Sequence, residues 1–465
     1  MTTERSTHGG SALPSITRLR AEVTGRVIVP GDAGYDEVRV VPNGAVDARP
    51  AVIVRPTNGR EVSSVVGVAR ESGLPLAVRS GGHSGAGHGV VDRSIVIDLR
   101  DMRALDIDVD GGTAWAETGL TAGEYSTALA AHGLATGFGD TGSVGIGGIT
   151  LGGGIGYLVR KYGLTIDDLL AVELVTADGK LLVADADHNP ELFWALRGGG
   201  GNFGVATRFK FRVHPVAQVV GGMLILPATP DVIVGFIAAA DAAPDELSTI
   251  LNVMSCPPLP FVPAEYHGKV IVMALLAYAG DTAGGDRALA PFRALATPIA
   301  DMLKAMPYPG LFPPEDPSYR PKAVVRNLFV DHVDHELAVT IIDTLEASDA
   351  QMRAAQLRVL GGAMARVPVD ATAFAHRGEK IMVNLAVFFE GHDDEALRTA
   401  WVTDFAAALK QGDARAYVNF LGDEGTDRVR AAYPAPTWDR LVAVKTKYDP
   451  QNLFRLNQNV PPAQV

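Results

Sequence analysis

Residues 79–87 read Arg-Ser-Gly-Gly-His-Ser-Gly-Ala-Gly, and they directly follow residues 74–78, which are apolar and have the pattern of a short strand. Glycine adopts positive φ angles easily and lets a backbone approach a ligand closely, because it has no Cβ atom. Successive backbone N–H groups in such a turn can bind an anion such as a pyrophosphate. The stretch therefore predicts a ligand-binding loop at the end of a strand, with His83 lying against the ligand.

Two further glycine clusters support this interpretation. Residues 141–156 read TGSVGIGGITLGGGIG, and residues 194–205 read WALRGGGGNFGV. Ordinary turns do not explain three glycine-rich loops in one part of the chain. We interpret them as one binding site for a long nucleotide cofactor that lies extended and contacts several loops.

Two other kinds of site are weaker interpretations of the same residues. Residues 152–156 contain a loose GxGxxG pattern, but a dinucleotide-binding Rossmann fold needs a preceding strand and an acidic residue about 20 positions later. Asp178 has nearly that spacing but lies in an Asp-Gly turn. His83 and His88 are five residues apart, yet no carboxylate or cysteine cluster accompanies them, so no metal site is predicted.

Composition and charge indicate a folded enzyme of two or three domains. The chain has 465 residues, 47% of them hydrophobic and 20% charged, with a net charge of −12. This charge and the absence of basic runs argue against nucleic acid or an anionic membrane as a partner. The apolar tract 216–243 is interrupted by prolines and is too broken to span a bilayer. A single cysteine excludes an intrachain disulfide, which fits a cytoplasmic protein. Residues 1–10 are polar and expected to be mobile.

The order of helices and strands favours an α+β fold over a regular doubly wound sheet. Helices are predicted at 61–72, closed by Gly73, and at 121–132. Asp178-Gly179 is expected to turn a hairpin between 171–176 and 180–184. Strands are also predicted at 51–56, 75–78, 95–99, 105–109 and 113–117. Beyond residue 215 the glycine clusters vanish and strands alternate with helices such as 231–242 and 393–410.

Five ordered segments resemble the berberine-bridge-enzyme-like FAD-linked oxidases of the vanillyl-alcohol oxidase and p-cresol methylhydroxylase (PCMH) superfamily. The segments are 79–87, 143–168, 192–207, 416–425 and 447–460. The resemblance, which is to the bacterial monocovalent type, implies a two-part FAD-binding domain of the PCMH type. It also implies an α+β substrate domain whose antiparallel sheet is covered by helices. The implied parts are an N-terminal extension with the first elements (1–44), the FAD-binding domain (45–215), the substrate domain (216–410) and a returning segment (411–465).

The resemblance implies that FAD is bound by three groups of residues. From the first loop they are Arg79, Ser80, Gly81, Gly82, His83, Ser84 and Gly85. From the second loop they are Thr141, Gly142, Ser143, Val144, Gly145, Gly148, Ile149, Gly152, Gly153, Gly154 and Gly156. The remaining residues are Gly204, Val205, Asn457 and Asn459. The alternative interpretation of the two asparagines is that they are ordinary C-terminal caps.

One covalent bond, from a ring nitrogen of His83 to the 8α-methyl group of the flavin, follows from the resemblance. Bicovalent relatives carry a cysteine where Thr141 stands, and threonine cannot form that thioether. Cys256 is expected to be a plain structural residue. Val144 is expected to lie against the flavin C4a and to leave room for O2. Ile149 replaces a histidine of plant members, so a polar contact to the flavin is either missing there or supplied by another residue.

Catalysis is assigned to Tyr417 and Asn419, which lie in the strand-like stretch 416–420. Strand alternation would place both on one face. Tyr417 is the expected base, and because a tyrosine normally titrates near 10, it needs a lowered pKa or a concerted transfer. Candidates for a helpful positive charge are Lys380 and Arg326. The alternatives to this assignment are a half-buried structural tyrosine, or a glutamate base at Glu390 or Glu379.

The expected function is an FAD-dependent oxidase that takes hydride from a hydroxyl- or amine-bearing carbon of a small molecule and gives H2O2 from O2. The substrate is expected to be a secondary-metabolite intermediate, a sugar or an N-heterocycle like those of nicotine-degrading members. The chain is expected to act as a monomer or homodimer. Alternatives are a flavin dehydrogenase that uses another acceptor, and a flavin- or sugar-binding protein without turnover.

Overall fold

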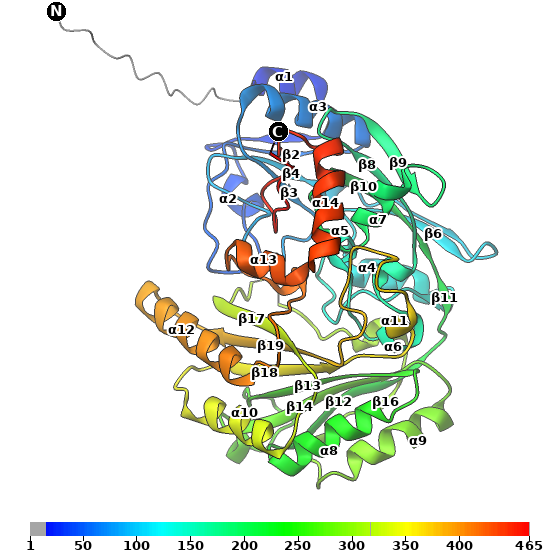
Figure 1. Cartoon of the computed structure of the whole chain (residues 1–465), viewed down its shortest axis with the longest axis vertical. Coiled ribbons are helices and arrows are strands. Elements are labelled where there is room, and N and C mark those ends of the chain that lie inside the picture. Colours follow the sequence, from blue (N-terminus) through cyan, green and yellow to red (C-terminus); the bar gives the residue numbers. More distant parts are fainter. Residues whose placement is uncertain (1–14, 317, 465) are drawn as a thin grey trace, which may run out of the picture.

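Two bodies of mixed helix and sheet are stacked in the molecule (Figure 1). The computed structural model describes residues 15–316 and 318–464. The upper body in the figure contains two larger sheets, a small two-stranded one formed by β7 and β11, and the C-terminal helices. The lower body contains one large sheet. Residues 1–14, which belong to the predicted N-terminal extension, lie outside the described residues. The mobility expected for residues 1–10 therefore stays a prediction.

The first sheet has four strands in the order β1-β2-β4-β3, with β2, β4 and β3 parallel and β1 antiparallel to β2. Helix α3 packs on it, because the valines of its apolar face share one core with β2 and β4. Gly73, with φ +66°, ends this helix, as the sequence predicts, whereas the helix begins two residues before the predicted start and is capped there by Asn58. The elements are β1 (Arg26–Ile28), β2 (Val52–Arg55), α3 (Gly59–Ser72), β3 (Leu76–Arg79) and β4 (Ile95–Asp98).

The second sheet is antiparallel, in the order β5-β6-β10-β8-β9. The predicted hairpin is present as β8 and β9, joined by a turn in which Gly179 has φ +82°. Its core is aromatic, with Phe138, Phe211 and Tyr125 meeting edge to face. The elements are β5 (Leu105–Asp108), β6 (Thr113–Glu117), α4 (Ala122–Ala130), α5 (Ile146–Gly152), β8 (Leu169–Val175), β9 (Leu181–Asp185), α7 (Pro190–Leu196) and β10 (Val205–Arg212).

The lower body is an antiparallel sheet of eight strands, covered on its outer face by helices, as expected. The order is β15-β12-β14-β13-β18-β19-β17, with β16 on β12. Helices α8, α9, α10 and α12 bury their apolar sides in one core with the strands. The strands are β12 (Val219–Pro227), β13 (Leu247–Ser255), β14 (Val270–Tyr278), β15 (Ala300–Asp301), β16 (Lys304–Met306), β17 (Ala323–Val330), β18 (Arg353–Val359) and β19 (Ile381–Phe388). The helices are α8 (Pro230–Asp241), α9 (Thr282–Arg293), α10 (His335–Ala347) and α12 (His392–Leu409).

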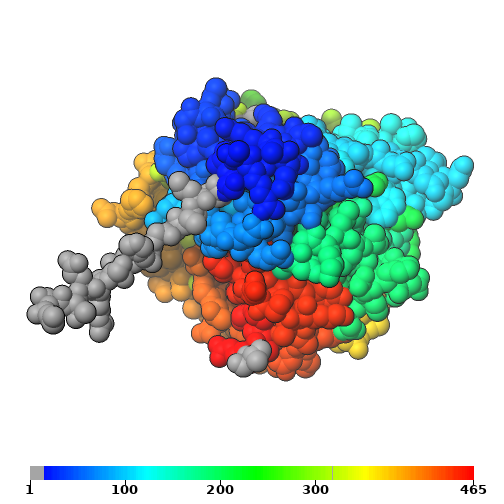
Figure 2. Space-filling model, turned by 90° about the horizontal axis from the view of Figure 1, so that it is seen from above, coloured from blue at the N-terminus to red at the C-terminus, as the bar shows by residue number. Residues whose placement is uncertain are grey.

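The C-terminal segment returns to the upper body. Helices α13 (Thr426–Ala432) and α14 (Ala435–Tyr448) share a core with the second sheet, and Phe454 enters the core of the first sheet. Figure 2 shows the first and last parts of the chain side by side on one face. Short elements complete the fold: α1 (Ile16–Glu22), α2 (Tyr35–Val38), η1 (Leu99–Asp101), β7 (Leu134–Ala135), α6 (Val159–Tyr162), η2 (Thr165–Asp167), β11 (His214–Pro215), η3 (Ala264–Tyr266), η4 (Tyr308–Leu311), α11 (Ala363–Arg366) and η5 (Val418–Phe420).

The strand predicted at 416–420 is wrong. Tyr417 has an extended backbone, but residues 418–420 form the 3-10 turn η5. A strand needs a neighbouring strand for its backbone groups. Here the N–H of Tyr417 donates instead to the side-chain Oδ1 of Asn327 on β17, at 2.6 Å.

Candidate active site

A cavity of about 420 Å³ runs between the two sheets of the upper body and the C-terminal segment. All three glycine loops contribute to its wall. Predicted site residues on the wall are Arg79, Ser80, Gly81, Gly82, His83, Ser84, Thr141, Val144, Gly145, Gly148, Ile149, Gly204, Tyr417, Asn419 and Asn457. The structure does not place on the wall Gly85, Gly142, Ser143, Gly152, Gly153, Gly154, Gly156, Val205 or Asn459.

The first and second glycine loops meet backbone to backbone. A Cβ atom on Gly81 would collide with the backbone of Gly145, and a Cβ on Gly145 would collide with Gly81. Gly82 turns the chain with φ +80°, a conformation that favours glycine. These close contacts bring the His83 loop and the Val144 loop onto one wall of the cavity.

Arg79 supports the first loop from within the protein. Its side chain is only 1% exposed, and Nη2 donates to Asp98 Oδ2 at 2.7 Å and to the carbonyl of Val38 at 2.6 Å. Because its Nη2 donor is committed to protein acceptors, Arg79 shapes the cavity without offering that group to a ligand. Asp98, also buried, accepts further bonds from Arg100.

His83 is joined to a carboxylate through a serine. Its Nε2 lies 3.0 Å from Ser143 Oγ, and Ser143 bonds to Glu315 through both its backbone N–H, at 2.9 Å, and its hydroxyl. Burial lowers the pKa of the His83 ring, while the charge of Glu315 acts in the opposite direction. The neutral ring is therefore favoured. Sequence analysis missed Glu315, because it lies in a proline-rich stretch with no motif.

Tyr417 receives two hydrogen bonds on its phenolic oxygen. The backbone N–H of Gly154 donates at 2.8 Å, and Asn419 Nδ2 donates at 2.8 Å. Asn419 Nδ2 also donates to the carbonyl of Ile149 at 3.1 Å, which fixes the orientation of the amide because a carbonyl only accepts. Tyr417 and Asn419 therefore act together, although they are not in a strand.

The glycine run 152–154 has a structural reason in this arrangement. A Cβ atom on Gly152 would collide with the amide of Asn419, and one on Gly153 would approach the ring of Tyr417 to 3.2 Å. Gly154 has φ +83° and supplies the N–H donor. These three glycines pack against Tyr417 and Asn419 and do not line the cavity.

Burial raises the pKa of Tyr417, and the donors Gly154 and Asn419 and the charge of Arg358 act in the opposite direction. Arg358 comes from β18 and pairs with Asp140 at 2.6 Å, across the two bodies. Its guanidinium carbon lies 5.4 Å from the centre of the Phe420 ring. Sequence inspection missed Arg358 because a charged residue in a strand carries no motif of its own.

Neither charge proposed from the sequence has this role. Lys380 is exposed and directly precedes β19. Arg326 lies beside Thr403 of α12, 3.4 Å from its hydroxyl, and beside Glu424 at the same distance. Neither side chain lines the cavity. For Arg326 the reason is strand alternation, which turns its side chain toward the helix-covered face of the sheet.

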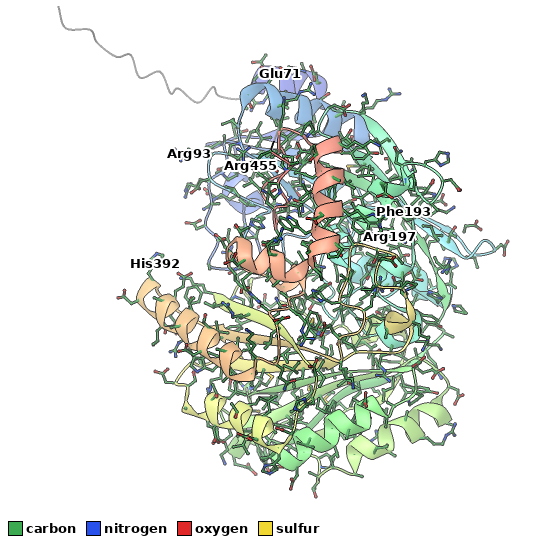
Figure 3. The ribbon with its side chains drawn as sticks, in the orientation of Figure 1. Glu71, Arg93, Phe193, Arg197, His392 and Arg455 are labelled. Carbon is green, nitrogen blue, oxygen red and sulfur yellow. The ribbon has the colours of Figure 1, made fainter. Side chains whose placement is uncertain are left out.

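The two glutamates weighed as alternative bases also lie away from the cavity. Glu379 pairs with Arg415 at 2.7 Å. Glu390 is exposed just before α12, and His392, two residues later, lies at the outer tip of that helix (Figure 3). Neither glutamate lines the cavity. Of the three residues considered as bases from the sequence, Tyr417 is the one that lines the cavity.

The C-terminal segment is held to the third glycine loop by a buried ion pair. Lys445 Nζ bonds to Asp449 at 2.6 Å and donates to the carbonyls of Asn202 at 2.8 Å and Phe454 at 3.0 Å. Asn202 lines the cavity and is another residue that sequence inspection missed. Asn457 donates to the Phe454 carbonyl at 3.0 Å.

These residues fit a flavin nucleotide. Among the described residues, the buried Oδ1 atoms of Asn457 and Asn459 have no hydrogen-bond partner, and Asn457 is on the cavity wall. A Cβ atom on Gly148 would enter open space, so the backbone there is bare toward the cavity. An elongated cavity with bare glycine backbone and an unpaired amide oxygen matches a ligand that is long, polar and rich in hydrogen-bonding groups.

Thr141 lies on the cavity wall, whereas Cys256 is buried in an apolar cluster of the lower body. Among the described residues, no group of three or more histidine, cysteine, aspartate or glutamate side chains is arranged to hold a metal ion. Within the same residues, no helix combines the length and apolar character needed to cross a bilayer.

Comparison with known families matches residues 50–185 to an FAD binding domain and residues 416–461 to the berberine and berberine-like family. The FAD-linked oxidoreductase YvdP of Bacillus subtilis is 32% identical over 471 residues, covering 95% of this chain and 99% of that protein. (R)-6-hydroxynicotine oxidase of Paenarthrobacter nicotinovorans is 28% identical, covering 95% and 97%.

Solved structures agree with these matches. The crystal structure of 6-hydroxy-D-nicotine oxidase from Arthrobacter nicotinovorans has a TM-score of 0.83 and 27% identity, covering 95% of this chain and 98% of that one. Phl p 4, a grass pollen allergen with glucose dehydrogenase activity, has a TM-score of 0.84 and 23% identity, covering 97% and 100%. The second similarity supports the fold alone.

Proposed function

The chain belongs to the berberine-bridge-enzyme-like family of FAD-linked oxidoreductases, α+β proteins with a PCMH-type FAD-binding domain, and on this basis we propose that it is an oxidase. Its substrate is a small organic molecule with a hydroxyl or amine on the carbon to be oxidised. Its electron acceptor is O2, which yields H2O2.

The arrangement around Tyr417 carries this proposal. Its phenolic oxygen accepts bonds from two donors, Gly154 N–H and Asn419 Nδ2, and Arg358 adds a positive charge. Donors aimed at an oxygen favour its charged form. Burial still holds the pKa of Tyr417 above its ordinary value, and these groups offset part of that rise. The small deprotonated fraction of Tyr417 takes the O–H or N–H proton of a substrate, and Asn419 keeps the phenolic oxygen in place during the transfer.

FAD bound in the cavity would supply the two-electron acceptor for the hydride that leaves the substrate carbon. Asn457, with its unpaired oxygen, and the bare backbone of Gly148 would contact it. His83 would hold it through one covalent bond, since the neutral ring is the nucleophilic form. Thr141 offers no thiol for a second bond.

Oxygen as acceptor rests on Val144, a small side chain on the cavity wall. The fold itself leaves the acceptor open, since neighbours with it include a glucose dehydrogenase and a chitooligosaccharide oxidase. In Phl p 4 variants, a glucose dehydrogenase and a glucose oxidase differ by one isoleucine-to-valine exchange. A dehydrogenase with a different acceptor is therefore the second candidate for this chain.

The proposal is tested by mixing the purified yellow protein anaerobically with a panel of alcohols, sugars and N-heterocyclic amines. A substrate is a compound that bleaches the flavin absorbance. Air-saturated buffer is then added in a stopped-flow instrument and peroxide is measured. Fast reoxidation with one H2O2 per flavin supports the oxidase. Slow reoxidation with fast transfer to a quinone or dye indicates the dehydrogenase. Bleaching by no compound in the panel would favour a binding protein without turnover.

A further inference from the structure

Three segments that are distant in the sequence converge at His83. The histidine is in the first glycine loop, Ser143 is in the second, and Glu315 comes from the lower body. Ser143 and Glu315 are 172 positions apart. Ser143 and Glu315 both lie off the cavity wall, so neither is positioned as a direct contact of a bound ligand.

The hydrogen-bonding capacities of these three groups determine which of them donates in each hydrogen bond. A carboxylate only accepts, so the hydroxyl of Ser143 donates to Glu315. The same hydroxyl oxygen is then available to accept from His83, 3.0 Å away, which places the ring proton on Nε2. The other nitrogen, Nδ1, consequently carries the free lone pair.

We propose that Glu315, acting through Ser143, is the proton acceptor that allows His83 to become covalently attached to FAD. This rests on the function proposed above. The new bond joins Nδ1 to the 8α carbon. A C–H bond of the 8α-methyl breaks, and the N–H bond at Nε2 breaks as its proton passes through Ser143 to Glu315. Two protons thus leave, the one from Nε2 to Glu315 and the one from the methyl group to water. The two electrons pass into the flavin and from there, with two protons, to O2, which becomes H2O2.

The carboxylate of Glu315 is exposed and is placed by its two bonds to Ser143. The backbone N–H of Gly44 donates to the carbonyl of Pro321 at 3.1 Å and holds the segment against the upper body. The lower body thereby supplies a group to the cofactor attachment of the upper body, and Glu315 is a positioning residue that works through Ser143.

The test measures cofactor attachment and does not depend on turnover. Wild type, Glu315→Gln, Ser143→Ala and a control, Asp316→Asn, are expressed with limiting riboflavin and incubated with FAD. Acid precipitation then separates attached from released flavin over time. We expect attachment in Glu315→Gln and Ser143→Ala to be slower by about 10²-fold, the lower end of general acid–base contributions. Asp316→Asn, which removes a neighbouring carboxylate, should attach FAD at the wild-type rate.

Two further readouts separate proton acceptance from a structural role. In Glu315→Gln the attachment rate should rise with pH, because hydroxide must replace the carboxylate. In Glu315→Ala, added acetate should restore part of the rate. Removal of the Glu315 charge favours neutral His83, so protonation of the ring cannot explain slower attachment.

The possible outcomes are distinct. If all flavin of the wild type is released by acid, the covalent bond of the proposed function is wrong, and this inference is overturned with it. If the wild type attaches FAD and Glu315→Gln, binding a full equivalent of FAD, attaches it equally fast, only the role of Glu315 is overturned. If Glu315→Gln does not bind FAD, the attachment rate of Ser143→Ala is compared with that of the wild type instead, and an equal rate overturns the proton path through Ser143 to Glu315.

Discussion

Asn419 donates one hydrogen bond to the phenolic oxygen of Tyr417, at 2.8 Å, and a second from the same nitrogen to the carbonyl of Ile149, at 3.1 Å. The amide therefore ties the proposed base to the glycine helix α5 that lines the flavin cavity. This relationship gives the site its geometry, and several expected mutational effects depend on it.

Tyr417→Phe should slow reduction of the flavin by substrate by about 10²–10⁴-fold, the usual contribution of a general base. The ring is kept, so folding and FAD binding should be preserved. Anaerobic stopped-flow absorbance measures the effect. Tyr433→Phe is the matched control, because that buried hydroxyl donates to the carbonyl of Gly198 and is off the cavity wall. A Tyr417→Phe enzyme that is as fast as the control would assign the base elsewhere.

Arg358→Met should move the pH dependence of flavin reduction to higher pH. The base must be deprotonated, so the rate rises with pH through its pKa. The positive charge of Arg358 lowers the pKa of Tyr417, so its removal raises that pKa. We expect a shift of about one pH unit, which corresponds to ~1.4 kcal/mol. Arg326→Met, whose side chain faces α12, should leave the profile in place. Equal profiles for all three proteins would contradict the role of Arg358.

His83→Ala should contain no acid-stable flavin, whereas the wild type should remain yellow after acid precipitation. Intact mass should show one FAD adduct per wild-type chain. Peptide mapping should find it on a peptide with His83 and on none with Thr141 or Cys256. An adduct at any other position would refute the attachment proposed here.

Val144→Ile should slow reoxidation of the reduced flavin by about tenfold, equivalent to about 1.4 kcal/mol of barrier. The added methylene would fill space on the cavity wall where O2 is expected to approach. Reduction by substrate should stay nearly unchanged, which serves as the internal control. Stopped-flow mixing with oxygenated buffer measures both rates, and an unaltered oxygen rate would remove Val144 as the determinant.

Gly152→Ala should slow flavin reduction by roughly ten- to a hundredfold, because the new Cβ would displace Asn419 and remove a hydrogen bond worth about 1.5–3 kcal/mol when the acceptor is charged. Asn419→Ala should have a similar effect without the collision. Gly67→Ala is the control, since a Cβ there meets only the end of the Arg18 side chain at 3.8 Å. Normal reduction in Gly152→Ala would show that Asn419 does not support the base.

Local sequence was a good guide where the signal is contiguous. The glycine loops, the α3 helix with its end at Gly73 and the Asp178-Gly179 hairpin were all predictable, because caps, turns and periodicity act within a few residues. The stretch 416–420 was misjudged for the opposite reason. An extended tyrosine becomes part of a strand only if another strand is beside it, and here a side chain of β17 takes that place.

By itself, then, the sequence determined the family, the α+β fold and the residues around a flavin nucleotide, since those features are written in short motifs whose chemistry is local. Only the tertiary structure decided which charges act on them. Arg358 and Asp140 are 218 positions apart, and Glu315 lies 172 positions from Ser143. Electrostatic and hydrogen-bonding effects depend on distance in space. The sequence cannot distinguish Lys380, Arg326 and Arg358 as neighbours of Tyr417. The packing of the lower body against the upper one brings Arg358 there and leaves the other two away from the cavity.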